Sequence, residues 1–161
     1  MTTEFAIRLM TPTDASRLKE IVDLSFSRFL SFFAIRSLYE KGQVLVSETR
    51  QTVTGFAKLI EFQVSAEKFG CILWIAVHPN FRRKGVATAL LNAGTMRLKA
   101  EGAKAIFASV QRRNTASLSV FYGQSFRKMG FVELWRLFRW RVFEFYGDIW
   151  HAPGEIVLMH D

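Results

Sequence analysis

A chain of 161 residues, half of them apolar and sixteen of them Phe, is long enough to bury the core of one domain and too apolar for a disordered tail. Three Pro and ten Gly leave little material for a linker, so we expect a single domain over residues 1–161. The formal net charge of +8 at pH 7 favours anionic partners, namely nucleic acid, membrane headgroups or a polyphosphate cofactor, but does not choose among them.

The N-terminal half of the sequence changes from a helical to a strand period. Apolar residues recur every three to four positions after Thr13 and Asp14, either of which can cap a helix, and a second helical stretch ends at Lys41 and Gly42. Short apolar runs then predict three strands that short turns join as an antiparallel meander. The elements predicted in this half are a strand over 5–10, helical segments over 11–26 and 28–40, and strands over 43–48, 56–64 and 70–77.

The C-terminal half is predicted to alternate helices with strands. Pro79 ends the third strand of the meander, an apolar stripe then runs from Val86 to Gly102, and Asn114 is placed to cap a further helix. We interpret the aromatic segment that begins at Gly130 as a strand. The elements predicted in this half are a helix over 86–101, a strand over 103–110, a helix over 114–126, and strands over 130–140 and 155–160. Both halves together give about seven strands and about four helices.

The segment HPNFRRKGVATALL, residues 78–91, places a basic turn between a strand and a helix. Such a turn is typical of an anion site, because the first N–H groups of a helix lack intrahelical partners and the helix dipole is positive there. Gly85 permits unusual backbone angles and the close approach of a ligand, and Arg82, Arg83 and Lys84 supply charge for a diphosphate. The segment is neither a Walker loop nor a G-x-G-x-x-G fingerprint. A basic turn without a ligand is the alternative.

The segment WIAVHPNFRRKGVATALL, residues 74–91, resembles the central signature of the GCN5-related N-acetyltransferases, the GNAT superfamily. The family pattern R/Q-x-x-G-x-G/A stands here as Arg82-x-x-Gly85-x-Ala87. Residues 114–131, NTASLSVFYGQSFRKMGF, resemble the second hallmark of the family, which is an Asn, a helix that carries a Tyr, and Gly-Phe before a strand. The order of the predicted elements is similar as well. The resemblance implies an α/β GNAT fold with a central, mixed but mostly antiparallel twisted sheet, and acetyl-CoA as the donor.

The resemblance also implies which residues hold acetyl-CoA. Strand backbone would meet the pantetheine arm, the basic turn and the start of the helix would surround the pyrophosphate, and the start of the next helix would lie near the pantetheine end. In that order the residues are Ile75, Ala76 and Val77; Arg82, Arg83, Lys84, Gly85, Val86, Ala87 and Thr88; and Asn114 and Ser117. No metal is implied, because no cluster of His, Cys and Asp has the spacing of metal ligands.

Acetyl transfer from a thioester to an amine needs a neutral amine, donors for the oxyanion and an acid for the leaving thiolate. The resemblance implies that a Tyr on the helix after Asn114 is this acid, and Tyr122 is the candidate. The spacing departs from the family pattern: counting from Asn114 places the Tyr at Phe121, and counting back from Gly130 places it at Phe126. A Tyr that packs without transferring a proton is the alternative.

The general base is harder to identify from the sequence. Some relatives carry Glu where this chain has Ser109, and others carry it where this chain has Cys71. Glu61, an acid on an otherwise apolar strand, is our candidate, with a solvated surface charge as the alternative. His78 can titrate near neutrality, whereas Cys71 is better interpreted as a small core residue. Deprotonation of the amine through water is compatible with this pattern.

The two early helices and the last strands border the acceptor groove in the family, and here these segments are aromatic. Residues 25–33 and 134–150 predict core and dimer surface, or else an aromatic acceptor pocket. Arg136, Arg139 and Arg141 alternate with aromatic residues, as in proteins that stack nucleic-acid bases. On an alternating strand, however, such arginines often face solvent.

The predicted function is acetyl-CoA-dependent N-acetylation of a primary amine by direct attack in a ternary complex. The acceptor is a protein N-terminus, a Lys or a small amine. The alternatives are a catalytically weak acyl-CoA-binding protein of the same fold and a nucleic-acid-binding module, which no RNP, KH or zinc pattern supports. The aromatic C-terminal third would suit a homodimer.

The compartment is predicted from cysteine use and hydropathy. The single Cys excludes an internal disulfide and fits a reducing compartment. The N-terminus lacks a signal-peptide pattern, and the longest uncharged apolar run, residues 71–77, is far shorter than the ~20 residues of a membrane helix. We therefore expect a cytoplasmic protein without a membrane partner.

Overall fold

The computed structural model describes residues 4–161. The chain forms two compact units. The first contains the chain up to Ile60 together with Trp74–Gly94, and the second contains Glu61–Leu73 and Thr95–Asp161. The boundaries between the units fall within two strands and one helix, so each unit contains a part of each of these three elements.

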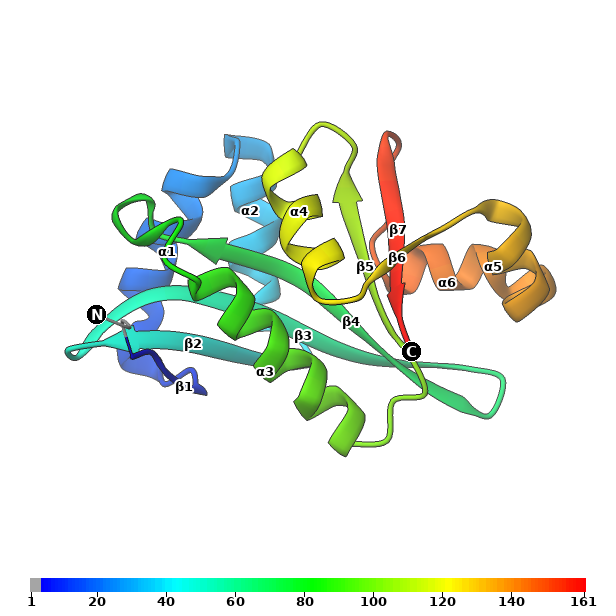
Figure 1. The fold of residues 1–161 in the computed structure, drawn as a ribbon, viewed down its shortest axis with the longest axis horizontal. Coiled ribbons are helices and arrows are strands. Elements are labelled where there is room, and N and C mark those ends of the chain that lie inside the picture. Colours follow the sequence, from blue (N-terminus) through cyan, green and yellow to red (C-terminus); the bar gives the residue numbers. More distant parts are fainter. Residues whose placement is uncertain (1–3) are drawn as a thin grey trace. The chain divides into compact units, whose positions relative to one another are not determined.

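Within residues 4–161, seven strands form one mixed sheet, which confirms the predicted α/β class. The order of the strands is β1-β2-β3-β4-β5-β7-β6. The pairings β1–β2, β2–β3, β5–β7 and β6–β7 are antiparallel, and the pairing β4–β5 is parallel. The strands, labelled in Figure 1, are β1 (Ala6–Leu9), β2 (Gln43–Thr49), β3 (Thr52–Val64), β4 (Glu67–Val77), β5 (Ile106–Gln111), β6 (Arg127–Met129) and β7 (Glu155–His160).

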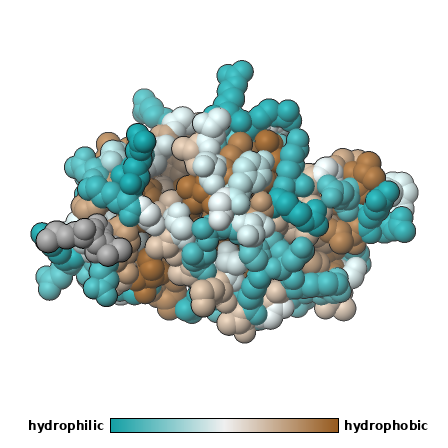
Figure 2. Space-filling view, in the orientation of Figure 1, coloured by the Kyte–Doolittle hydropathy of each residue, from teal (hydrophilic) through white to brown (hydrophobic). Residues whose placement is uncertain are grey.

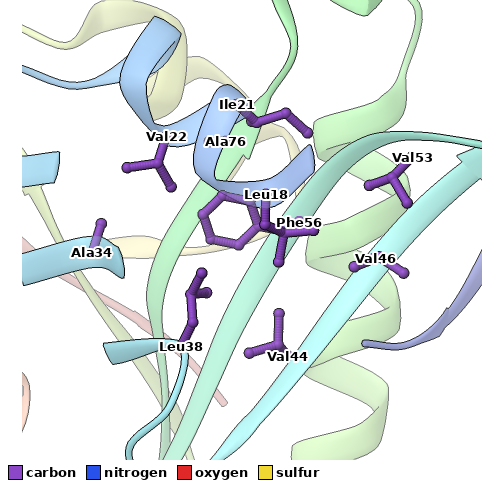
Figure 3. Packing of buried hydrophobic residues seen from close by; sticks show 10 residues of the cluster. All are labelled: Leu18, Ile21, Val22, Ala34, Leu38, Val44, Val46, Val53, Phe56 and Ala76. Carbon is purple, nitrogen blue, oxygen red and sulfur yellow. The ribbon is translucent and has the colours of Figure 1, made fainter. Parts of the chain in front are cut away.

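In the first unit, helices α1 (Ala15–Ser25) and α2 (Arg28–Ser37) pack on one face of the strands. The apolar residues of these helices, spaced by three to four positions, contact alternate residues of β2. A helix places residues of that spacing on one side, and a strand places alternate residues on one face, so the two apolar surfaces can pack together. Figure 3 shows this cluster of buried side chains. Its members are Leu18, Ile21, Val22, Ala34, Leu38, Val44, Val46, Val53, Phe56 and Ala76.

Helix α3 (Val86–Ala100) begins in the first unit, against Gly55 of β3. A Cβ added at Gly55 would stand 2.8 Å from the carbonyl oxygen of Ala76 and 3.1 Å from a methyl of Val86. Only Gly therefore allows the first turn of α3 to approach the strands this closely. Phe56, the next residue along β3, points into the cluster of α1 and α2, so the start of α3 packs on the opposite face.

In the second unit, an aromatic core joins the strands to two short helices near the C-terminus. Helices α5 (Phe131–Phe138) and α6 (Val142–Asp148) are connected by a 3-10 turn over Arg139–Arg141. The rings of Phe138 and Phe145 stack with centroids 4.5 Å apart, and Phe107 of β5 meets Phe145 at 4.8 Å. Helix α4 (Thr115–Gly123) precedes β6 in this unit. None of the helices in residues 4–161 is long and apolar enough to cross a membrane.

The strand predicted over 130–140 is wrong, because this segment forms α5 and the following turn. The buried side chains of the segment recur every three or four residues, a helical period: they are Leu134, Phe138, Val142, Phe145 and Ile149. Exposed aromatic residues lie between these buried ones, and they made the helical period hard to recognise in the sequence. Figure 2 shows apolar surface near α5. The sixth strand is instead the short β6, and residues 4–161 contain six α-helices rather than about four.

The prediction of a strand along which three arginines alternate with aromatic residues is also wrong. Arg136 lies on α5, and Arg139 and Arg141 lie in the 3-10 turn. All three are exposed. They do not form the row on one strand face that stacking of successive bases would use.

Candidate functional site

The loop between β4 and α3 is anchored by its first residue, His78. The N–H of His78 donates to the carbonyl of Thr54 at 2.8 Å, and its Nδ1 accepts from the N–H of Asn80 at 3.2 Å. Its Nε2 lies 3.5 Å from a carboxylate oxygen of Glu20, and the residue is buried. His78, a secondary candidate for the base, thus fixes the start of the loop.

Two of the three consecutive cations also fix the loop, Arg82 to β4 and α1 and Lys84 to the loop itself. The guanidinium of Arg82 donates to the carbonyl of Val77 at 3.0 Å and to the hydroxyl of Ser25 at 3.2 Å. The ammonium of Lys84 donates to the carbonyl of Asn80 at 3.0 Å and lies 5.4 Å from the ring centroid of Phe81. These contacts hold the turn against the end of β4. Figure 1 shows the path of the chain from β4 through this turn to α3.

Arg83 differs from its neighbours. Within residues 4–161 its side chain meets no hydrogen-bond or ion-pair partner, and it is exposed. Its backbone has φ +61°, a left-handed conformation that costs a non-Gly residue on the order of 1 kcal/mol. Such strain is common at ligand sites, because surrounding contacts must hold it in place.

The backbone from Arg83 to Thr88 presents a continuous set of amide donors. The first hydrogen bond of α3 runs from the N–H of Ala89 to the carbonyl of Gly85, at 3.0 Å. In the described chain no N–H of residues 83–88 makes an intramolecular hydrogen bond. Left-handed angles at Arg83 and at Gly85, where φ is +85°, turn successive N–H groups inward as in an anion-binding nest. A Cβ at Gly85 would meet nothing within 4 Å, so the space beside these donors is open.

The predicted strand residues Ile75, Ala76 and Val77 are the last three of β4. The side chain of Ala76 joins the core cluster, and the carbonyl of Val77 is the one that Arg82 binds. All the predicted pyrophosphate residues, from Arg82 to Thr88, lie with them in the first unit.

The other predicted residues belong to the second unit. The side-chain oxygen of Asn114 accepts from the N–H of Ser117 at 3.1 Å, so Asn114 caps α4 as its position predicted. Phe121 and Phe126, the positions found by counting along the family pattern, are buried with their rings 5.0 Å apart. Tyr122 is 46% exposed and is the residue of this helix that offers a phenol to solvent.

Glu61, the candidate base, and Cys71, which stands where some relatives carry a Glu, also lie in the second unit. The carboxylate of Glu61 pairs with Lys68 at 3.1 Å and is exposed, which favours the alternative of a surface charge. Cys71 is fully buried, and burial raises the pKa of its thiol far above the ordinary range. The thiol is therefore inert, as expected of a core residue.

A cluster of Ser109, His151 and Glu155 was missed in the sequence. The hydroxyl of Ser109 lies 2.7 Å from Nδ1 of His151 and donates to a carboxylate oxygen of Glu155 at 2.5 Å. Burial lowers the pKa of His151, and the charge of Glu155 opposes this shift. The three residues come from β5, from the turn after α6 and from the start of β7, so no spacing along the chain links them. The one available signal was that Ser109 stands where some relatives carry a Glu.

Comparison with protein families gives one match. Residues 13–131 match the model of the acetyltransferase (GNAT) family. The match includes the loop of residues 78–91 and α4, but ends before His151 and Glu155. A comparison with the curated proteins finds no match to this sequence.

Solved structures share the fold at low sequence identity. A GNAT-family protein from Desulfovibrio desulfuricans is 19% identical, with a TM-score of 0.74 over 98% of this chain and 99% of that chain. An acetyltransferase from Bacillus subtilis, solved with CoA, is 18% identical, with a TM-score of 0.71 over 98% and 99%. The ribosomal-protein-S18-alanine N-acetyltransferase from Escherichia coli is 16% identical, with a TM-score of 0.67 over 97% and 92%.

Proposed function

We propose that this chain, which belongs to the acetyltransferase (GNAT) family, transfers the acetyl group of acetyl-CoA to a primary amine. The observation that carries the proposal is the run of amide donors from Arg83 to Thr88, which make no intramolecular hydrogen bond in the described chain. They stand at the N-terminus of a 15-residue helix, where the helix dipole favours a phosphate. Acetyl-CoA is the phosphate-bearing donor of the family.

The binding of acetyl-CoA is assigned as follows. The pyrophosphate would accept from the amides of 83–88, with the free guanidinium of Arg83 beside it, while Arg82 and Lys84 hold the turn. The pantetheine arm would follow residues 75–77, with Asn114 and Ser117 near its end. The net charge of +8 and the CoA complex of the Bacillus subtilis acetyltransferase support this assignment.

The proposed reaction is a direct attack in a ternary complex. The neutral amine nitrogen forms a bond to the thioester carbonyl carbon, the C–S bond breaks, and the amine loses one proton to a base. The thiolate of CoA takes a proton from an acid, for which we propose Tyr122, because it is the exposed phenol on α4.

The acceptor is proposed as a class, namely a protein N-terminus, a Lys or a small amine. The Escherichia coli protein, whose name states an alanine of ribosomal protein S18 as the acceptor, supports a peptide that begins with Ala as the first probe. The resemblance in fold does not extend to the acceptor, so the probes must differ in chemistry.

The test is release of free CoA thiol from acetyl-CoA in the presence of four amines. The amines are a peptide with N-terminal Ala, an Nα-blocked Lys peptide, glucosamine and spermidine. Turnover with at least one amine is expected. Binding of acetyl-CoA without turnover on all four would refute the enzyme and leave the acyl-CoA-binding alternative.

The role of Tyr122 is tested with the variant Tyr122→Phe. Loss of a general acid should lower kcat by about 10²- to 10⁴-fold without changing the affinity for acetyl-CoA. Tyr39→Phe is the matched control, since Tyr39 is an exposed Tyr of the first unit. If both variants keep the activity of the parent, Tyr122 packs without transferring a proton.

We also propose that the chain acts as one GNAT domain and forms a homodimer. Matches over 98% of the chain support one domain. The exposed apolar residues of α5 and the turn after it, Phe131, Leu137 and Trp140, support self-association. Sedimentation at micromolar concentration tests the dimer, and a monomer there would refute it.

A further inference from the structure

The hydrogen bonds among Ser109, His151 and Glu155 have a defined direction. A carboxylate only accepts, so the single hydrogen of the Ser109 hydroxyl goes to Glu155, at 2.5 Å. The hydroxyl oxygen must then accept from His151, whose Nδ1 lies 2.7 Å away and therefore carries a hydrogen. The neutral imidazole consequently has its lone pair on Nε2.

The fold holds this imidazole in place. The ring of His151 stacks on Tyr146 of α6 with centroids 4.9 Å apart. The backbone N–H of His151 donates to the backbone carbonyl of Tyr146 at 3.0 Å. The carboxylate of Glu155 is fixed by a second donor, the N–H of Ala152, at 3.0 Å. The orientation of the ring is thus set from α6, β5 and β7 together.

Nε2 of His151 faces outward from this cluster. Its side chain is 23% exposed, and within residues 4–161 Nε2 meets no hydrogen-bond partner. It is not among the buried polar atoms without a partner, which in this part of the chain are Oγ1 of Thr49 and Thr95 and Nε1 of Trp74. A lone pair that solvent reaches, backed by an oriented carboxylate, is the arrangement of a general base.

We propose that His151 is the general base that removes the proton from the acceptor amine, with Ser109 and Glu155 as positioning residues. This inference rests on the proposed acetyl transfer. As the amine nitrogen bonds to the carbonyl carbon, its proton passes to Nε2, and the imidazole becomes an imidazolium. The carboxylate of Glu155, 3.9 Å from Nδ1, stabilises that positive charge directly and through the Ser109 hydroxyl. The base regains its neutral form by releasing the proton to water.

The pairing of the strands defines the face of the sheet on which His151 lies. In the pairing of β5 with β7, Ser109 lies opposite Val157 and Ile106 lies opposite His160, so Ser109 and His160 point to opposite faces. Phe126 contacts His160 and also Phe121 of α4, which places α4 on the face of His160. Tyr122 and His151 therefore belong to elements on opposite faces.

The groups that face His151 determine its titration. From β5 it meets the neutral Ser109, from β7 the anionic Glu155, and from α6 the ring of Tyr146. Burial lowers the pKa of the imidazole, and the charge of Glu155 raises it by less, so the ring is neutral at pH 7.5. Activity should therefore fall as the pH drops through the pKa of His151, below its ordinary value of about 6.5.

The test compares pH profiles of kcat/KM for the parent and His151→Gln, using the amine from the four-amine panel that the parent acetylates. The parent should show an acidic limb below about pH 6.5, and the variant should lose that limb together with about 10²- to 10⁴-fold of its rate at pH 7.5. Glu155→Gln should move the limb to lower pH, because it removes the charge that raises the pKa of His151. His160→Gln is the matched control and should retain the profile of the parent.

The outcomes separate the two proposals. No turnover by the parent would refute the acetyl transfer and this inference with it, whereas turnover with the same acidic limb in His151→Gln would refute only the base. A thermal shift with acetyl-CoA should be equal in the parent and His151→Gln, which shows that the variant folds and holds the donor. ¹⁵N NMR of His151 supplies a readout without an acceptor: the hydrogen should reside on Nδ1, and finding it on Nε2 would overturn the proposal.

Discussion

Gly85 allows the donor site to be tested against a matched position beyond the other end of α3. Gly85 precedes α3 with φ +85°, and Gly102 follows α3 with φ +97°. A Cβ at either position would meet nothing within 4 Å. Glu substituted at each residue therefore adds the same charge and the same backbone strain without a clash. The two positions differ in that the amides of residues 83–88, which make no hydrogen bond within residues 4–161, lie beside Gly85 and at the opposite end of α3 from Gly102.

The strain of a left-handed residue with a side chain is about 1–2 kcal/mol. For a chain of 161 residues, 1 kcal/mol corresponds to about 2–4 °C in Tm, so each variant should melt about 2–8 °C below the parent. Acetyl-CoA at ~100 times its Kd should add about 2.7 kcal/mol to the stability of a competent site. That gain corresponds to a rise in Tm of about 5–10 °C.

The assay is a thermal-shift titration of the parent, Gly85→Glu and Gly102→Glu with acetyl-CoA. The parent and Gly102→Glu should show the full rise, while Gly85→Glu should show none, because its carboxylate stands beside the amides and repels phosphate. A full rise in Gly85→Glu would refute the assignment of the pyrophosphate to this loop. An equal loss in both variants would show that strain or charge, not the position of the side chain, determines binding.

Three further substitutions test individual contacts. Arg82→Lys keeps the charge but cannot reach both oxygens that Arg82 binds, and because Arg82 is exposed, chemical denaturation should show a loss of about 0.5–1.5 kcal/mol. A variant as stable as the parent would contradict this. Arg83→Ala should leave stability within about 0.5 kcal/mol and weaken acetyl-CoA binding in calorimetry, and unchanged binding would count against a direct contact. Asp14→Asn should destabilise by about 1–3 kcal/mol at pH 7, because the ion pair with Arg8 lowers the pKa of Asp14 to about 2. The stabilisation by Asp14 is present above about pH 4 and is lost as the pH falls towards 2. In urea titrations the free energies of unfolding of parent and variant should therefore converge near pH 2. A difference that stays constant with pH would refute the ion pair as the source of the stabilisation.

The elements that could be predicted from the sequence are those with a clear local period. Strand β7 and helix α3 were predicted within one or two residues, because their apolar residues follow a single period between clear end signals. Helices α5 and α6 were not, since Phe131, Trp140 and Phe143 are apolar yet exposed. When apolar residues lie on both sides of a helix, the stripe that faces the core is hidden, and only the packing partners identify it.

The candidate site divides in the same way. The donor loop is a contiguous stretch whose backbone provides the ligands, so a short motif was enough to locate it. The cluster of Ser109, His151 and Glu155 depends on the register of β5 with β7, which pairs Gln111 with Glu155 and so brings Glu155 to the face of Ser109. A slip of one residue would turn Ser109 to the other face. Nothing in the sequence fixes that register without the core packing, so the cluster could not be predicted.

The three like charges before α3 are explained by a division of roles. Arg82 is directed to the carbonyl oxygen of Val77, at the end of β4, and Lys84 to that of Asn80, in the turn. Each cation there meets a partial negative charge, which reduces its repulsion with its neighbours. Their contacts hold Arg83 in its left-handed conformation, and this conformation contributes to directing the amides of 83–88 to one side. Arg83 is then the one cation of the three with a side chain that no described residue binds. With a single cation at this place, the contacts of Arg82 and Lys84 that hold the turn would be missing. With three cations, two hold the turn and the third provides a charge for the anion.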